Sequence, residues 1–252
     1  MRHGAPQDEG IAAHGPNEID APQGVFKAIR GAEVPFEVKI LGADAERREI
    51  RDRVADFGAI RFAGRRRDMV ERIGNDSRAR DALPTKIDTS RLTLRAPIRG
   101  DAPALAQLAD NKNIAEKLSR LPSPYSQRDA IAFIEIFAQR ADERPYAIIS
   151  HAGAFLGIVG FTFAIGQHPE LGYWLGEPHW GKGYMSEAVK GLIEAAHATH
   201  LFPVIRARAL TTNTGSLNVL EKAGFKNIGE TTDVIGTNLG KQVFVFRLEQ
   251  PR

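Results

Sequence analysis

The order of strand and helix patterns after residue 85 is the feature that most limits how this chain can fold. Period-two alternation and runs of β-branched or aromatic residues are typical of strands, and apolar stripes at helical spacing are typical of helices. From Lys86 to Leu248 these patterns follow each other as one strand, two or three helices, three strands, a helix, a strand, a helix and two strands. Neither a repeated strand-helix-strand unit nor an all-strand sandwich has this order. It predicts an α+β fold, with a mixed central sheet of about six to seven strands flanked by helices.

The individual patterns assign these elements to residue ranges. Ser126 and Asp129 form a capping-box pattern, which starts a helix that reaches Phe137. A second helix is expected from Tyr184, and a shorter one over about 214–223 with Gly224 as its left-handed C-terminal residue. The predicted strands cover residues 91–95, 146–150, 156–165, 171–175 and 204–210, followed by one that starts at Phe225 and one over 241–248.

Residues 1–84 have a different character. They are dominated by Gly, Pro, Asp, Glu and Arg, and the block Asp44–Arg53 carries both signs of charge almost residue by residue. Their apolar clusters are too short to bury a core alone. We therefore expect an N-terminal extension over 1–84, disordered or marginally structured, and a folded domain over 85–252. Two interpretations of the extension stay open: translation that begins at Met69, or a genuine tail or docking module with a strand at Phe36–Ile40.

Composition excludes several classes of protein. With 42% hydrophobic and 26% charged residues, the chain is typical of globular proteins. It has no run of about 18 apolar residues and no secretory signal at the N-terminus, so we expect a cytoplasmic protein with no membrane partner. Because cysteine is absent, a disulfide framework, a cysteinyl acyl-enzyme and Cys-based metal sites are all excluded.

Charge and histidine spacing argue against two further kinds of ligand. The net charge is only +3, which is not the strongly basic balance of a nucleic-acid-binding protein. Arginine runs such as Arg65–Arg67 are usually solvated when they lie in a polar segment. His197 and His200 are spaced for one helix face, but no third ligand accompanies them, so we expect no metal site.

The segment Glu170–Ala188 carries the most chemical information, because it combines a strand, a glycine-rich turn and a helix. Gly181 and Gly183 allow backbone N–H groups to approach a ligand closely, and the helix that starts at Tyr184 adds unpaired N–H donors and the positive end of its dipole. Such a turn binds anions, and Lys182 adds a positive charge. The pattern taken alone also fits a simple connection, since it is neither a phosphate-loop nor a dinucleotide fingerprint.

Two ordered motifs make the chain resemble a known superfamily. The first comprises Gly172–Leu175, Trp180–Tyr184 and Glu187–Ala188, and the second is Asn213–Phe225. Together they resemble the GNAT N-acetyltransferases, and within these the ribosomal-protein-alanine (Rim-type) branch. The resemblance extends over about Ile87–Leu248. It implies the GNAT fold, in which acetyl-CoA lies between splayed central strands and its pyrophosphate sits on the glycine-rich turn.

The resemblance also implies which residues contact the coenzyme, namely Leu175, Gly181, Lys182, Gly183, Tyr184, Met185 and Asn213. A backbone N–H near Leu175 would stabilise the oxyanion, and Asn213 would hydrogen-bond the pantetheine arm. The family's turn has the form Gln/Arg-x-x-Gly-x-Gly/Ala, so Trp180 and Met185 depart from it. A methionine in place of Gly or Ala at position 185 would affect how closely the coenzyme can approach the start of the helix.

The same resemblance implies two catalytic residues. Glu170, at the start of the central strand, would accept a proton from the incoming amine, and Ser216 would donate a proton to the departing CoA thiolate. Glu230 and Asp233 remain alternatives for the carboxylate. Without the family, Asn213 and Ser216 are interpreted as the cap and first turn of a helix.

The implied reaction is direct attack of a neutral primary amine on the acetyl thioester. Deprotonating a peptide α-amine with a pKa of about 8 costs about 1.4 kcal/mol at pH 7, whereas a lysine near about 10.4 costs about 4.6 kcal/mol. A site with a weak base therefore favours a protein or peptide N-terminus as acceptor, as in the Rim-type branch. The alternatives are a small-molecule amine such as a polyamine or antibiotic, and a GNAT-like domain that binds acyl-CoA as a non-catalytic sensor. A monomer and a homodimer are both compatible with the sequence.

Overall fold

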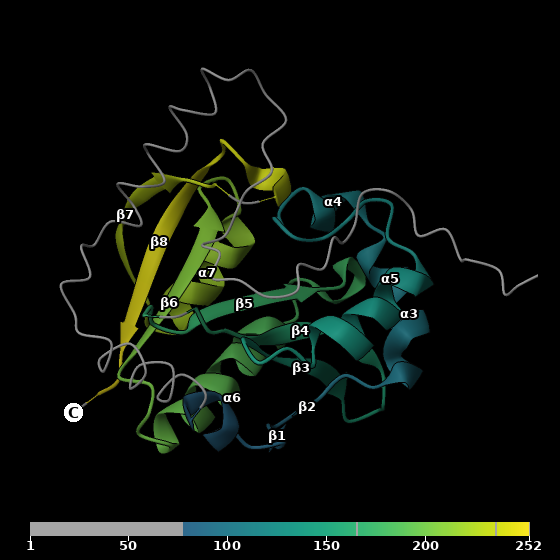
Figure 1. Ribbon diagram of the computed structural model, residues 1–252, viewed down its shortest axis with the longest axis horizontal. Coiled ribbons are helices and arrows are strands. Elements are labelled where there is room, and N and C mark those ends of the chain that lie inside the picture. Colours follow the sequence, from purple (N-terminus) through teal and green to yellow (C-terminus); the bar gives the residue numbers. More distant parts are fainter. Residues whose placement is uncertain (1–77, 165, 235, 252) are drawn as a thin grey trace, which may run out of the picture. The chain divides into compact units, whose positions relative to one another are not determined.

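The computed structural model describes residues 78–164, 166–234 and 236–251 (Figure 1). The chain divides into a unit of residues 1–43 and a unit of residues 44–252, and every described residue belongs to the second unit. The expectations for Met69 and for a strand at Phe36–Ile40 therefore lie outside the described residues. Ala79 and Leu83, just before the predicted domain start at residue 85, are buried in the core.

The described part is built on one eight-stranded mixed sheet, with the strands in the order β1-β2-β3-β4-β5-β6-β8-β7. Neighbouring strands are antiparallel except for β5 and β6, which are parallel. The strands are β1 (Lys86–Asp88), β2 (Leu92–Arg95), β3 (Glu143–Ser150), β4 (Phe155–Thr162), β5 (Glu170–Leu175), β6 (Val204–Leu210), β7 (Lys226–Thr232) and β8 (Gln242–Glu249). The sheet confirms the predicted α+β class.

Within the described residues, the labelled α-helices are α3 (Ala102–Ala109), α4 (Lys112–Ala115), α5 (Gln127–Ala132), α6 (Tyr184–Ala198) and α7 (Thr214–Lys222), and residues 78–82 are also helical. Single turns occur as η1 (Arg99–Asp101), η3 (Glu177–His179) and η4 (Gly236–Asn238), and η2 (Phe133–Phe137) is a π-helical turn. The capping box at Ser126 and Asp129 starts α5 as predicted. The helical segment reaches Phe137, but its last turn is π-helical, with Ala138 N donating to Phe133 O at 2.8 Å.

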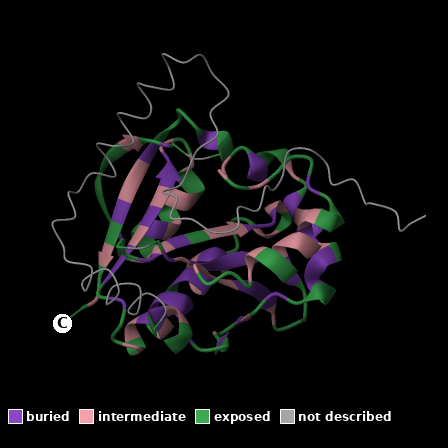
Figure 2. Cartoon of the chain, in the orientation of Figure 1, coloured by how far each residue is buried: buried purple, intermediate pink, exposed green. Residues whose placement is uncertain are grey.

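Helices cover both faces of the sheet, which explains why the central strands are so apolar. Seven of the eight residues of β4 are buried, as expected for a strand that is covered on both sides. Successive side chains of a strand point to opposite faces. Accordingly, Ile148 packs with residues of α6 and α7 in one hydrophobic cluster, and its neighbours Ala147 and Ile149 pack with α3, α5 and η2 in another. Figure 2 shows this buried centre beside the exposed edge strand β7.

The sheet has one strand more than the six to seven predicted. The extra strand is β1, which pairs with β2 over Lys86–Asp88. Three residues are too few to show a strand period, so the sequence pattern gave no signal for it.

Candidate active site

A cleft opens where β5 and β6 separate. These parallel strands pair only at Glu170 with Arg206 and at Leu171 with Ala207. Beyond these pairs, the rest of β5 and β6 borders a cleft of about 660 Å³. The α4–α5 connection, the turn before α6 and the start of α7 complete its walls.

The hydrogen-bond pattern of β5 determines which of its amides face this cleft. Bonded pairs alternate along an antiparallel ladder, and Gly176 N donates to Leu156 O of β4 at 2.8 Å. The amides two and four residues earlier therefore also face β4, and those of Tyr173 and Leu175 point the other way, toward β6. The carbonyl of Leu175 points to the same side, where it accepts from Trp180 Nε1 at 2.7 Å. The cleft thus presents two strand N–H donors next to a carbonyl that is already bonded.

The glycine-rich turn forms one end of the cleft. Gly181 and Gly183 have φ angles of 72° and 78°, in the left-handed region that favours glycine. A Cβ on Gly181 would meet no heavy atom within 4 Å, so the space above this residue is open. Gly183 is also the N-cap of α6 and makes no side-chain cap hydrogen bond. First-turn amides without a side-chain cap are the donors that anions use at helix starts.

The side chains around the turn determine its packing and its charge. Met185 is only 7% exposed and belongs to the main hydrophobic cluster, so its side chain is part of the core. His179 lines the cleft beside the turn, and burial, with a smaller effect of the positive charge of Lys182, lowers the pKa of its imidazole. A neutral imidazole at pH 7 adds no positive charge to the turn.

Across the cleft, the start of α7 brings three polar groups together. Asn213 caps the helix, because its side-chain oxygen Oδ1 accepts from Ser216 N at 3.2 Å. The Tyr173 hydroxyl lies 2.8 Å from Ser216 Oγ and donates to the Ser216 carbonyl at 3.2 Å. Burial raises the pKa of the Tyr173 phenol, since its hydrogen bond with Ser216 compensates only in part. The two hydroxyls form a neutral pair at physiological pH.

The polar end of the cleft is a cluster around Arg208. Its Nε donates to Glu170 Oε1 at 3.0 Å, and its Nη1 lies 3.5 Å from Asp233 Oδ1. Ser119 Oγ donates to Asp233 Oδ2 at 2.9 Å, and Asn238 Nδ2 donates to Ser119 Oγ at 3.2 Å. The Glu170 side chain is 37% exposed and that of Asp233 only 7%. One guanidinium is therefore shared between two carboxylates that face the same cleft.

The structure brings most of the sequence-predicted residues together. The cleft is lined by Glu170, Leu175, Gly181, Gly183, Tyr184, Met185, Asn213 and Ser216, and also by Asp233. Among the residues that the structure describes, Lys182 and Glu230 do not line the cleft. Lys182 takes part in the turn through its carbonyl, which accepts from Arg91 Nη1 at 3.1 Å. Glu230 is exposed on the edge strand β7.

Sequence reasoning missed the contacts of Tyr173, Arg208 and Ser119. A signal existed for Arg208, because β6 reads VIRARAL and places two arginines on one face of an otherwise apolar strand. No comparable signal marks Ser119, which lies 114 residues from its partner Asp233.

The sheet order, the separating strands and the turn before α6 have the arrangement of a GNAT-type acyltransferase. Comparison with known proteins supports this class. The family described as acetyltransferase (GNAT) domain matches residues 91–226. An uncharacterized N-acetyltransferase p20 of Bacillus licheniformis is 31% identical over 150 residues, which cover 58% of this chain and 84% of that protein. The chain therefore belongs to the GNAT acetyltransferases and is an acyltransferase.

Solved structures show the same fold. RimL, a ribosomal L7/L12 alpha-N-protein acetyltransferase in complex with coenzyme A, matches with a TM-score of 0.58 and 22% identity, covering 65% of this chain and 97% of that chain. The spermidine N-acetyltransferase of Vibrio cholerae, in complex with CoA and spermine, matches with a TM-score of 0.55 and 21% identity, covering 64% of this chain and 96% of that chain.

The described residues contain neither a metal-binding cluster nor a membrane-spanning helix. No group of three or more His, Cys, Asp or Glu side chains in this part of the chain could hold a metal ion. The helices that the structure describes are each too short or too polar to cross a membrane.

Proposed function

We propose that this protein transfers an acetyl group from acetyl-CoA to a primary amine, and that the preferred amine is the N-terminal α-amine of a protein or peptide. The observation that carries the proposal is the cleft between β5 and β6, which joins the glycine-rich turn at one end to the Glu170–Arg208–Asp233 cluster at the other. RimL, which is similar in fold, is an alpha-N-protein acetyltransferase that binds coenzyme A. We assign the acetyltransferase domain to the predicted residues 85–252 together with residues 78–84, because Ala79 and Leu83 pack in its core.

We assign the coenzyme to the side of the cleft nearest the turn. The open space above Gly181 allows a pyrophosphate to approach the backbone amides of Gly181, Gly183, Tyr184 and Met185. The acetyl carbonyl then reaches the strand N–H groups of Tyr173 and Leu175. Such preorganised donors stabilise the negative charge that develops on this oxygen during attack.

Acetyl transfer then proceeds in one displacement. The neutral amine nitrogen attacks the thioester carbonyl carbon, a C–N bond forms and the C–S bond breaks. The nitrogen loses a proton to the Glu170 carboxylate, directly or through a water molecule, and CoA leaves as its thiolate. Asp233 is the alternative base, but its two oxygens already accept from Ser119 and Arg208, and it is the more buried of the two carboxylates.

We assign Ser216 as the group that meets the departing thiolate. A thiol with a pKa of about 8.5 is a stronger acid than a phenol of pKa about 10, and burial raises the pKa of the neighbouring Tyr173 further. Complete proton transfer from this pair to the thiolate is therefore uphill. Tyr173 has one hydroxyl proton, which it donates to the Ser216 carbonyl in the structure. When this hydroxyl turns to donate to Ser216 Oγ instead, the serine O–H is free to point to the sulfur and to stabilise the thiolate by hydrogen bonding.

Arg208 supports a peptide as the acceptor. A guanidinium has five N–H donors, and the contacts with Glu170 and Asp233 use two of them. The remaining donors can bind the carbonyl oxygen of the acceptor's first peptide unit, next to the α-amine. A polyamine has no such oxygen and would bring further positive charge toward Arg208. The lower pKa of an α-amine also suits a base that is already paired with a guanidinium.

An acceptor comparison tests this function. The full chain is incubated with acetyl-CoA and one of three acceptors: a lysine-free peptide with a free N-terminus, the same peptide with an acetylated N-terminus and one added lysine, or spermidine. CoA release and the mass of each product are measured. We expect acetylation of the first peptide with a kcat/KM at least about tenfold above the others. Preference for spermidine would overturn the peptide assignment. Binding of acetyl-CoA without transfer to any amine would point to an acyl-CoA sensor.

A further inference from the structure

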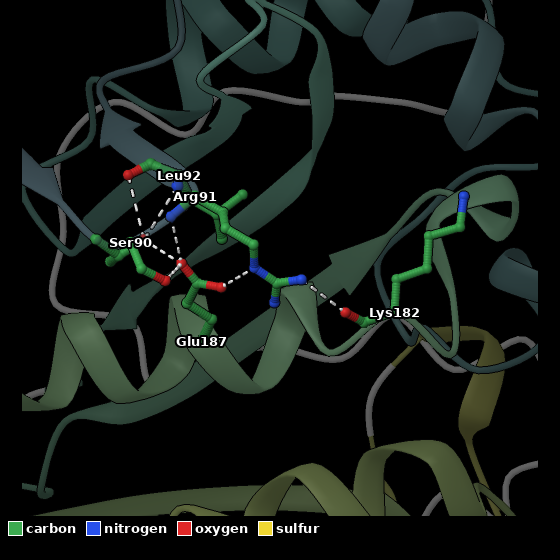
Figure 3. A network of polar contacts seen from close by, with 6 residues as sticks. Ser90, Arg91, Leu92, Lys182 and Glu187 are labelled. Atoms are coloured by element: carbon green, nitrogen blue, oxygen red, sulfur yellow. Dashed lines mark hydrogen bonds and ion pairs between the residues drawn. The ribbon is translucent and has the colours of Figure 1, made fainter.

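A partly buried carboxylate, that of Glu187, connects the turn between β1 and β2 to the first turns of α6. Glu187 Oε1 accepts from Thr89 Oγ1 at 2.7 Å, from Ser90 Oγ at 2.9 Å and from Arg91 N at 2.8 Å. Its other oxygen, Oε2, accepts from Arg91 Nε at 2.6 Å. Figure 3 shows the arginine extended between this carboxylate and the glycine-rich turn.

The other side of the Arg91 guanidinium contacts the turn itself. Its Nη1 donates to the Lys182 carbonyl at 3.1 Å, and its Cζ lies over the Tyr184 ring, 4.6 Å from the ring centre. Its Nη2 would lie 3.5 Å from a Cβ on Gly183. A single side chain thus reaches three consecutive residues of the turn and of the start of α6.

Glu187 places a negative charge near the start of α6, and Arg91 neutralises it. Burial alone would raise the pKa of Glu187, but the hydrogen bonds from Thr89, Arg91 and Ser90 together lower it to about 2. The carboxylate is therefore ionised at physiological pH, near the helix start where a pyrophosphate would bind. Uncompensated, this charge would oppose a bound anion. The ion pair with Arg91 compensates it.

We propose that Arg91 is a positioning residue for the coenzyme: it holds the Lys182 carbonyl so that the amides of the turn face outward, and it neutralises Glu187 beside them. This inference rests on the proposed function. It predicts that Arg91 matters for the phosphate-bearing part of acetyl-CoA and has no effect on the chemistry at the thioester.

Comparing two acetyl donors tests the proposal. Acetyl-CoA carries the pyrophosphate, whereas S-acetyl-pantetheine carries the same thioester without phosphates. We expect Arg91→Gln to raise the KM for acetyl-CoA about tenfold, in line with the loss of one charge-assisted hydrogen bond, with kcat nearly unchanged. Its kcat/KM with S-acetyl-pantetheine should equal that of the wild type. A merely structural role would lower activity with both donors.

Two further variants separate geometry from charge. Arg91→Lys keeps the charge but cannot span Glu187 and the Lys182 carbonyl with a planar fork, so its KM for acetyl-CoA should be intermediate. In Arg91→Gln/Glu187→Gln the uncompensated carboxylate is gone, so this variant should bind acetyl-CoA more tightly than Arg91→Gln alone.

Arg95→Gln is the matched control. Arg95 lies on the adjoining strand β2 and forms an ion pair with Asp101 at 2.8 Å, and neither residue lines the cleft. Its KM values for both donors should stay at the wild-type level. Circular dichroism establishes whether each variant is folded. If Arg91→Gln does not fold, the two acetyl donors are compared with Arg91→Lys instead.

Equal losses with both donors, or none with either, would overturn the role of Arg91. Failure of the wild type to use acetyl-CoA with any amine would instead overturn the proposed function.

Discussion

Replacing Gly181 by alanine separates the effect of the turn on folding from its effect on the coenzyme. Gly181 has a φ of +72°, and a Cβ there would meet no heavy atom within 4 Å. The added methyl group therefore clashes with nothing in the protein. Its folding penalty is the backbone strain of a left-handed alanine, about 1–2 kcal/mol. For a domain of this size, that corresponds to a fall in Tm of about 2–8 °C.

We also expect Gly181→Ala to lose affinity for acetyl-CoA, and backbone strain in the free protein does not account for this loss. If phosphate oxygens approach the turn closely, the new methyl group displaces them and weakens at least one charge-assisted hydrogen bond, worth about 1.5–3 kcal/mol. The Kd for acetyl-CoA should then rise about 10- to 150-fold. Calorimetric titration measures the Kd, and thermal unfolding without ligand measures the Tm.

Gly153→Ala is the matched control for backbone strain. Gly153 has a φ of +85°, and a Cβ there would also meet nothing within 4 Å, but it lies in the β3–β4 hairpin and does not line the cleft. The two variants should lose similar stability, and only Gly181→Ala should lose affinity. Equal Kd values for Gly181→Ala and the wild type would refute the assignment of the phosphates to this turn.

Three further variants probe other parts of the site. Because the pKa of Glu187 is lowered to about 2 from the usual 4.5, its ionised form stabilises the fold above pH 4.5 and this stabilisation is lost as the pH falls toward 2. Glu187→Gln should therefore weaken the pH dependence of urea unfolding across that range, and an unchanged acid limb would contradict this. Tyr173→Phe removes one hydrogen bond behind Ser216, so it should lower kcat about fivefold and leave the KM for acetyl-CoA within about twofold; an unaltered kcat would exclude the hydroxyl pair. Arg208→Gln should raise the KM for the peptide about tenfold without weakening spermidine acetylation, and an equal loss with both acceptors would show that Arg208 does not select the peptide.

Local patterns were enough to predict the elements that carry the turn. Gly183 and Tyr184 mark the start of α6 by residue type alone, and Asn213 is a cap that any helix of this kind would use. The start of α6 and the cap of α7 were predictable because neighbouring residues in the chain determine them. The resemblance to GNAT enzymes added the expectation that the coenzyme lies between splayed central strands.

Long-range contacts could not be predicted in the same way. Ser119 and Asp233 meet only because two loops far apart in sequence come together, and Gly236 approaches so closely that a Cβ would collide with the Ser119 carbonyl. The pairing of Glu170 with Arg208 likewise depends on the short parallel register of β5 and β6. No periodicity in a single sequence encodes which polar side chains will face each other across two strands.

Titrating acetyl-CoA into the full chain, beside Gly183→Trp, tests the central claim most directly. A Cβ on Gly183 would lie 3.5 Å from Arg91 Nη2, so a tryptophan there would crowd Arg91 and distort the turn whose amides are assigned to the phosphates. We predict saturable binding by the wild type with one coenzyme per chain, and no measurable binding by the variant if it remains folded. A folded wild type that binds no acetyl-CoA, or a variant that binds it equally well, would contradict the assignment of this cleft as the coenzyme site.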